Sequence, residues 1–302
     1  MSLGLLFLLL PKVRVNFEAL RSLDLMEFGQ MLVRASLSEV VENHRDHMWR
    51  REGDVRVEDA LSAERFVNTV GFCNALTDCR RPGPSLFIAV CGRRDARLPR
   101  NIQKDPESRL TWTIKDEILE RGRVYYAKLL KGHSTFISRK LVPCFHSLLG
   151  IPRGKESLLL SPQARDVLTV LREEWEMSTA DLRKASGVRE RAQFNKAMDE
   201  LQRTLKVIPT QVVYEPSFTY IWSLAEIRFQ EELRTSVNKE EALKEIARAY
   251  LTGAGKTFRG ELARCTGLSS VDAGLGNWGL VAEGFAVRTG PGIYSLRGLE
   301  EG

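Results

Sequence analysis

Apolar residues recur every three or four positions in the second half of the chain, and this spacing predicts amphipathic helices. A first helix begins at the capping pair Ser161 and Pro162. After two further helices, β-rich segments at 206–214 and 218–222 flank a turn. The apolar stripes predicted for the first and third helices are Ala164, Val167, Leu168, Leu171 and Trp175, and Phe194, Ala197, Met198, Leu201 and Leu205. Three helices followed by a hairpin are the order of elements in a winged helix-turn-helix domain.

The same order of elements recurs further along the chain. An apolar stripe again marks a first helix, at Leu243, Ile246, Ala247 and Tyr250. Segments 280–288 and 293–296 flank a glycine-containing turn and predict a second hairpin. The pattern therefore predicts a mainly α protein with short β-hairpins, of the α+β class, built from tandem winged helix-turn-helix domains. We expect these domains at 156–235 and 238–298, after an N-terminal helical segment at 1–60 and a central domain at 61–150.

The positive charge of the chain is concentrated in the predicted central domain. The formal net charge is +6, and residues 80–140 alone carry 15 basic and 6 acidic side chains. Such a local excess favours a polyanionic partner such as double-stranded DNA, although solvated arginines that only aid solubility are the alternative. The candidate phosphate-binding residues of this stretch are Arg93, Arg94, Arg97, Arg100 and Lys104.

The two predicted winged helices differ in what they offer a nucleic acid. The third helix of the first carries cations that suit phosphates and base edges, at Arg189, Arg191 and Lys196. The predicted third helix of the second, which begins at the cap Ser269 and contains Val271, Leu275 and Trp278, has neither lysine nor arginine. DNA contact is therefore expected mainly from the first winged helix. The second is expected to be a packing or protein-interaction module, or to contact DNA only through Lys256, Arg259 and Arg288.

Cysteine usage and hydropathy indicate a cytoplasmic protein. The five cysteines are widely spaced and never form a CxxC pair, which argues against a disulfide scaffold or a zinc ribbon. The apolar segment 2–10 is too short to cross a membrane and lacks a signal peptide's basic start, so no membrane partner is expected. Met26 or Met31 could instead be the true start, which leaves open whether residues 1–25 belong to the native protein.

The central domain carries the motifs of a known family. The segments LTWTIK at 110–115, YYAKLL at 125–130 and STFIS at 134–138 resemble the signature region of the AlkZ-related winged-helix DNA glycosylase superfamily. The leading segment 64–76 and both winged helices fit the same layout, so that the resemblance covers about residues 60–296. It implies a DNA-repair protein that acts on damaged duplex DNA.

Residues of this signature region suit contact with DNA. Aromatic rings such as that of Tyr126 can stack on bases, and lysines can bind phosphates. The alternative is that the aromatic residues are core at helical spacing. The predicted nucleic-acid contacts in this region are Lys115, Tyr126, Lys128 and Lys131.

The resemblance also implies a catalytic motif that the equivalent segment of this chain lacks. In the family, a Gln-x-Gln or Gln-x-Asp motif in the amino-terminal domain positions the attacking water, and segment 66–70 contains neither. If segment 66–70 is the equivalent stretch, Asn68 stands at the second polar position, and Glu64 would supply the carboxylate. The departure leaves open whether the protein is an enzyme, while DNA binding is unaffected.

Three functions follow from these observations. The first is a DNA-binding protein of repair type that recognises damaged or distorted duplex with weak or no catalysis. The second is an active N-glycosylase, and the third a winged-helix transcriptional regulator. No cofactor is expected, and no metal, because the histidine pair His44 and His47 has no distant His or Cys partner. The oligomeric state and the lesion are left open.

Overall fold

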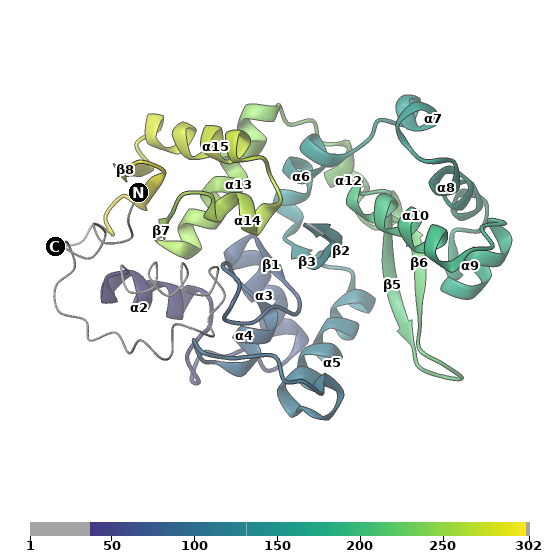
Figure 1. Cartoon of the computed structure of the whole chain (residues 1–302), viewed down its shortest axis with the longest axis horizontal. Helices are drawn as coiled ribbons and strands as arrows, with labels where there is room; N and C mark the ends of the chain where they lie inside the picture. Colours follow the sequence, from purple (N-terminus) through teal and green to yellow (C-terminus); the bar gives the residue numbers. More distant parts are fainter. Residues whose placement is uncertain (1–36, 131, 300–302) are drawn as a thin grey trace, which may run out of the picture. The chain divides into compact units, whose positions relative to one another are not determined.

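The computed structural model describes residues 37–130 and 132–299. The predictions for residues 1–25 and for Lys131 lie outside the described residues. Within them, no helix is both long and apolar enough to cross a membrane. Figure 1 shows a mainly α protein with three small antiparallel sheets, as expected for the fold class.

Three segments of the chain share one topology, helix, strand, helix, helix and two-stranded hairpin. In each, the single strand pairs with the last strand of the hairpin, which gives sheet orders β1-β3-β2, β4-β6-β5 and β7-β9-β8. Repeat A consists of α3 (Ala60–Val70), β1 (Phe72–Asn74), α4 (Leu86–Cys91), α5 (Pro106–Arg121), β2 (Tyr125–Leu130) and β3 (His133–Ile137). Repeat B consists of α8 (Pro162–Glu174), β4 (Glu176–Ser178), α9 (Thr179–Ala185), α10 (Arg191–Arg203), β5 (Val207–Val213) and β6 (Thr219–Leu224). Repeat C consists of α13 (Lys239–Ala254), β7 (Lys256–Thr257), α14 (Glu261–Thr266), α15 (Ser270–Ala282), β8 (Ala286–Gly290) and β9 (Ile293–Leu296).

Repeats B and C follow the order that the sequence predicted for two winged helices, and repeat A adds a third copy in the basic central segment. The hairpin β5–β6 of repeat B projects beyond its helices (Figure 1). The remaining elements are α2 (Glu39–Met48), α6 (Val142–Leu149), α7 (Glu156–Leu159), α11 (Ala225–Arg228), α12 (Gln230–Arg234) and the short 3-10 turns η4 (Ile102–Lys104), η5 (Arg139–Leu141) and η6 (Arg153–Lys155).

Repeat B has its own hydrophobic core, made by the stripes that the periodicity predicted. The Ser161 hydroxyl caps α8 by accepting from the Ala164 N–H, and Pro162 occupies the first turn. Its buried side chains include Val167, Leu168 and Leu171 on α8 and Phe194, Met198 and Leu201 on α10. The last residue of each predicted stripe does not belong to this core. Trp175 follows the last residue of α8, and its indole is exposed. Leu205 lies beyond the end of α10 and is buried in the larger core of the described residues.

Repeats A and C share a second, larger core. Tyr250 of α13 stacks on Phe72 of β1 with ring centroids 6.3 Å apart, and it also faces Trp49. Gly253 lets α13 approach the indole of Trp49 closely, because a Cβ atom at this position would lie 2.8 Å from the Trp49 Nε1 atom. Helix α2 adds a polar tie, since Arg45 donates to the Ala254 carbonyl oxygen at 2.8 Å. The fold of repeat C therefore depends on contacts with repeat A.

The buried carboxylate of Glu156 fixes the segment that precedes repeat B. It accepts from Arg172 at 2.8 Å and from Lys206 at 2.6 Å. Burial alone would raise the pKa of Glu156, but the hydrogen bonds from Lys206 and Arg172 outweigh it and hold the pKa below the usual 4.5.

This ion pair gives repeat B a pH-dependent stability. A carboxyl group whose pKa is lowered by folding stabilises the fold above its unfolded pKa, and this contribution is lost as the pH falls through the folded value. We therefore expect the unfolding free energy to fall on acidification below pH 4.5 through this group. Chemical denaturation at several pH values measures this change in the unfolding free energy. In Glu156→Gln the same acidification should cost less, and an identical pH profile would contradict the assignment.

Candidate functional site

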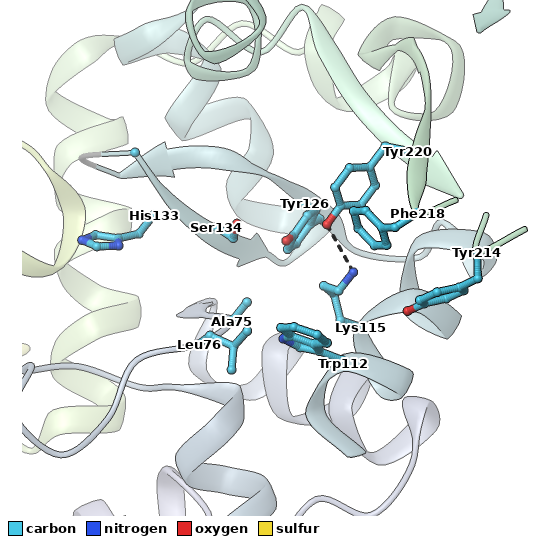
Figure 2. A pocket seen from close by; sticks show the side chains of 11 residues that line it. Ala75, Leu76, Trp112, Lys115, Tyr126, His133, Ser134, Tyr214, Phe218 and Tyr220 are labelled. Atoms are coloured by element: carbon cyan, nitrogen blue, oxygen red, sulfur yellow. Dashed lines mark hydrogen bonds between the residues drawn. The ribbon is translucent and has the colours of Figure 1, made fainter. Parts of the chain in front are cut away.

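A pocket of about 330 Å³ opens between repeats A and B. Its walls come from the third helix and hairpin of repeat A, from the end of β1, and from the hairpin of repeat B (Figure 2). The lining residues are Ala75, Leu76, Trp112, Lys115, Tyr126, Gly132, His133, Ser134, Tyr214, Phe218 and Tyr220. The volume lies within the range of about 300–1,000 Å³ that is usual for small-ligand sites.

The pocket is predominantly aromatic. Tyr126 is buried and packs against Phe136, with ring centroids 4.8 Å apart. On the opposite hairpin, Phe218 meets the rings of Tyr214 at 5.7 Å and Tyr220 at 5.3 Å. Phe218 and Tyr214 are 57% and 55% exposed, so that their ring faces are open to a ligand. Such a lining suits a flat, apolar group.

A polar cluster lies at one side of these rings. Lys115 is only 7% exposed, and its ammonium group is hydrogen-bonded to the Asp116 carboxylate. The same Nζ atom donates to the Tyr220 hydroxyl at 3.3 Å, as drawn in Figure 2. The Tyr214 hydroxyl donates to the other oxygen of Asp116, so that repeats A and B are joined through one carboxylate. Burial and the bond to Asp116 raise the pKa of Tyr214 to about 12.

Helix α5 places Lys115 in the pocket because of its local sequence. Asp105 caps the helix by accepting from the Ser108 N–H at 2.8 Å, and Pro106 occupies the first turn. Ile114 and Ile118 turn one face of α5 into the core, and Lys115 falls at the edge of that face. The cation is thus held at a fixed position.

The structure brings two of the predicted DNA contacts into the pocket and places others elsewhere. Lys115 and Tyr126 line it, both buried rather than on an open basic surface. Lys128 pairs with Asp199 of α10 at 3.1 Å, and its backbone N–H donates to Gln202. Arg189, Arg191 and Lys196 lie exposed at and before the first turns of α10.

The arginine-rich stretch divides into two kinds of residue. Arg93 and Arg94 are engaged in ion pairs with Glu107 and Asp46. Arg97, Arg100 and Lys104 are exposed and, among the described residues, have no carboxylate within ion-pair distance. Only the second group is therefore free to bind phosphate without breaking a contact of the fold.

The predicted catalytic pair lies outside the pocket. The Glu64 carboxylate is buried and accepts from Arg121 at 2.6 and 3.1 Å, and Arg123 lies 3.7 Å away. Asn68 is exposed one turn further along α3. Neither residue lines the pocket. Their catalytic role remains a prediction, while the geometry of Glu64 suits a structural ion pair.

The variant Glu64→Gln separates the two roles of Glu64. We expect it to lower the unfolding free energy by about 1–2 kcal/mol, because Arg121 loses a charged partner. Urea denaturation followed by circular dichroism measures this change. Unchanged stability, with loss of an excision activity that the parent protein has, would instead assign Glu64 to catalysis.

Sequence reasoning missed the lining residues Tyr214 and Phe218. It also missed Asp116, which does not line the pocket but is hydrogen-bonded to Lys115 and Tyr214. Asp116 directly follows the signature segment, and Tyr214 and Phe218 flank the predicted turn of the first hairpin. Two exposed aromatic residues beside a hairpin turn were the available signal. Among the described residues, no group of three or more His, Cys, Asp or Glu could hold a metal ion.

Comparisons with known proteins agree with this architecture. The fold is similar to that of the Streptomyces sahachiroi DNA glycosylase AlkZ, with a TM-score of 0.50 and 11% sequence identity over 84% of this chain and 69% of that one. At this sequence identity, the match shows similarity of the fold alone. No curated protein matches. The model of the AlkZ-related family matches residues 57–265, which is more than half of the chain, and the protein therefore belongs to the AlkZ-related family.

Proposed function

We propose that this protein binds damaged or distorted duplex DNA and receives an extruded base in the aromatic pocket. The observation that carries the proposal is the make-up of the pocket walls. In winged helices, the third helix and the hairpin are the elements that meet DNA. Here the third helix of repeat A and the hairpins of repeats A and B supply most of the lining. The lining is rich in aromatic residues, and the pocket volume suits a small flat group. Proteins that read an unpaired base stack it between such side chains.

The exposed cations supply the affinity for the phosphate backbone. Arg97, Arg100 and Lys104 of repeat A are available for phosphates, as are Arg189, Arg191 and Lys196 of repeat B. Such contacts act on any sequence and depend strongly on salt. Selectivity for a lesion then comes from the pocket, because a damaged or mismatched base costs less to extrude. A protein with this function would act at the nucleoid.

The exposed and the paired arginines should respond differently to substitution. We expect Arg97→Ala/Arg100→Ala to reduce the slope of log K against log salt by up to about 2, at unchanged stability. Arg93→Ala/Arg94→Ala should mainly lower stability, by about 1 kcal/mol, because ion pairs are lost. Fluorescence anisotropy with labelled duplex at several salt concentrations measures the slope. Equal slopes in parent and Arg97→Ala/Arg100→Ala would remove the exposed arginines from the interface.

The test of the function uses duplexes that contain the fluorescent base 2-aminopurine. Placed opposite an abasic site, the base is easily extruded, and its emission should change when it enters the pocket. Placed in an intact pair, it should stay stacked and respond less. The protein should also bind the first duplex more tightly. Equal affinity for both duplexes, with no change in emission, would contradict the proposal.

A second candidate is base excision, favoured by the position of Asp116. Its carboxylate lies beside the pocket, bonded to Lys115 and Tyr214. A carboxylate there can orient water and stabilise positive charge on the sugar as the glycosidic bond breaks. Incubation with alkylated duplex followed by alkali tests for strand breaks, and the breaks should vanish in Asp116→Asn. Lesion-selective binding without breaks would restrict the function to recognition.

A further inference from the structure

A second cavity, of about 630 Å³, shares no residue with the aromatic pocket. It lies where repeat B meets α6, α11 and α12, and the segment 151–153 contributes to its wall. Four cations line it, Arg153, Arg172, Lys206 and Arg234, together with the carboxylate of Glu226. The rest of the lining consists of His146, Gln230 and apolar side chains, among them the indole of Trp175.

The cations of this cavity are positioned for an anion from outside the chain. Glu156 holds Arg172 and Lys206 in place through hydrogen bonds of 2.8 and 2.6 Å. The Nε atom of Arg172 is buried and has no hydrogen-bond partner. Arg153 and Arg234 are exposed, and no described carboxylate lies within ion-pair distance of either. A buried donor without a partner is costly unless a ligand satisfies it.

Backbone strain is concentrated at the same cavity. Among the described residues, three that are not glycine have a positive φ, and two of them, Trp175 at +69° and Leu205 at +57°, line it. The positive φ of Leu205 is explained by packing, because its side chain is only 2% exposed and its burial in the core offsets the strain. Trp175 is 65% exposed, so that burial of the indole does not offset the strain. A glycine would be the ordinary residue there. Strain that is retained at an open position is typical of a binding site.

We propose that this cavity binds a nucleotide, with the phosphate ester on the cations and the base stacked on Trp175. Arg153 and Arg234 supply donors for phosphate oxygens, and Arg172 adds positive charge to the cavity wall. The indole offers a flat apolar face, and Glu226 can accept a hydrogen bond from a base amino group or a sugar hydroxyl. The nucleotide is either a free monophosphate or one unit of a single DNA strand. This inference does not depend on the aromatic pocket.

The experiment uses the full chain and three probes: adenosine monophosphate, inorganic phosphate and a short single-stranded oligonucleotide. Tryptophan fluorescence and calorimetry measure binding. We expect the monophosphate to bind, inorganic phosphate to compete with it, and Arg153→Ala/Arg234→Ala to weaken it at least tenfold. The matched control, Arg65→Ala/Arg109→Ala, removes the same charge from exposed positions outside the cavity and should bind as the parent does. Binding of the oligonucleotide alone, with the same loss in Arg153→Ala/Arg234→Ala, would identify the source as a DNA strand.

The variant Trp175→Gly tests the indole and the strain together. It should lose the fluorescence response and at least tenfold in affinity, while its Tm stays unchanged or rises, because glycine tolerates the left-handed backbone. A merely structural tryptophan would give the opposite result, a lower Tm with unchanged binding. Failure of all three probes to bind would overturn the proposal, as would monophosphate binding that survives both Trp175→Gly and Arg153→Ala/Arg234→Ala. Neither result would affect duplex recognition, which is measured separately with 2-aminopurine.

Discussion

Trp112→Ala is expected to weaken binding to a duplex with an easily extruded base about 5- to 150-fold and to leave binding to intact duplex nearly unchanged. Trp112 lines the aromatic pocket beside Lys115, and stacking of one base on an aromatic side chain contributes about 1–3 kcal/mol. The intact duplex keeps its bases stacked and depends on the phosphate contacts, which this substitution leaves in place. Titration of both 2-aminopurine duplexes at one salt concentration measures the two affinities.

The matched control for this prediction is Trp278→Ala. Trp278 is also partly exposed but lies on α15 of repeat C, away from the pocket lining. It should not change the preference between the two duplexes. If Trp112→Ala weakened binding to both duplexes equally, the indole would be part of a general DNA surface or of the fold rather than a platform for an extruded base.

Tyr250→Ala is expected to destabilise the protein by about 3–5 kcal/mol, the usual cost of truncating a large buried aromatic side chain. The ring is 2% exposed and contacts Phe72 of repeat A as well as Trp49, so that its loss opens a cavity between repeats A and C. Denaturation with urea, followed by circular dichroism, measures the change. Tyr250→Phe keeps the ring and serves as the control, with a small effect.

The size of that effect tests whether repeats A and C are coupled. A cost below about 1 kcal/mol would mean that the space is refilled by neighbouring side chains or that the two repeats pack loosely. A matched truncation in the separate core of repeat B, Phe194→Ala, should cost a similar amount. Tyr250→Ala removes a contact between repeats A and C, whereas Phe194→Ala disturbs the core of repeat B alone.

The helices of repeats B and C could be predicted because their apolar stripes are regular. Val167, Leu168 and Leu171 are buried as the spacing indicated. Trp175 continues the same spacing, yet it lies outside the helix, because α8 ends one residue earlier and the chain turns through a left-handed conformation. Periodicity predicts which face is buried, but it does not reveal where a helix ends when no glycine or proline marks the end.

The order of elements in repeat A could not be predicted from the sequence, for two physical reasons. Its second helix, α4, is apolar on every side and buried throughout, so that it shows no amphipathic period. The stretch 92–105, which contains the arginines, separates α4 from α5 and hides the compact order seen in the other copies. The basic charge there drew the interpretation toward DNA contact rather than topology.

The aromatic pocket could be predicted only in part. Lys115 and Tyr126 were expected to touch DNA because of their chemistry, and both reach the pocket. The burial of Lys115 could have been anticipated, since it follows Ile114 on the buried side of α5. The contribution of Tyr214 and Phe218 could not, because it depends on how repeats A and B pack, and residues about a hundred positions apart carry no local signal of contact.

The two walls of the aromatic pocket have different freedom to change during evolution. On the side of repeat A, Tyr126 and Lys115 are buried, so that most substitutions there would disturb the core. On the side of repeat B, Phe218 is exposed near a hairpin turn, where surface substitutions cost little stability, whereas Tyr214 is exposed but also bonds to Asp116 of repeat A. In the proposed function, exchange of Phe218 would therefore change the preference for an extruded base, while the buried wall of repeat A maintains the fold.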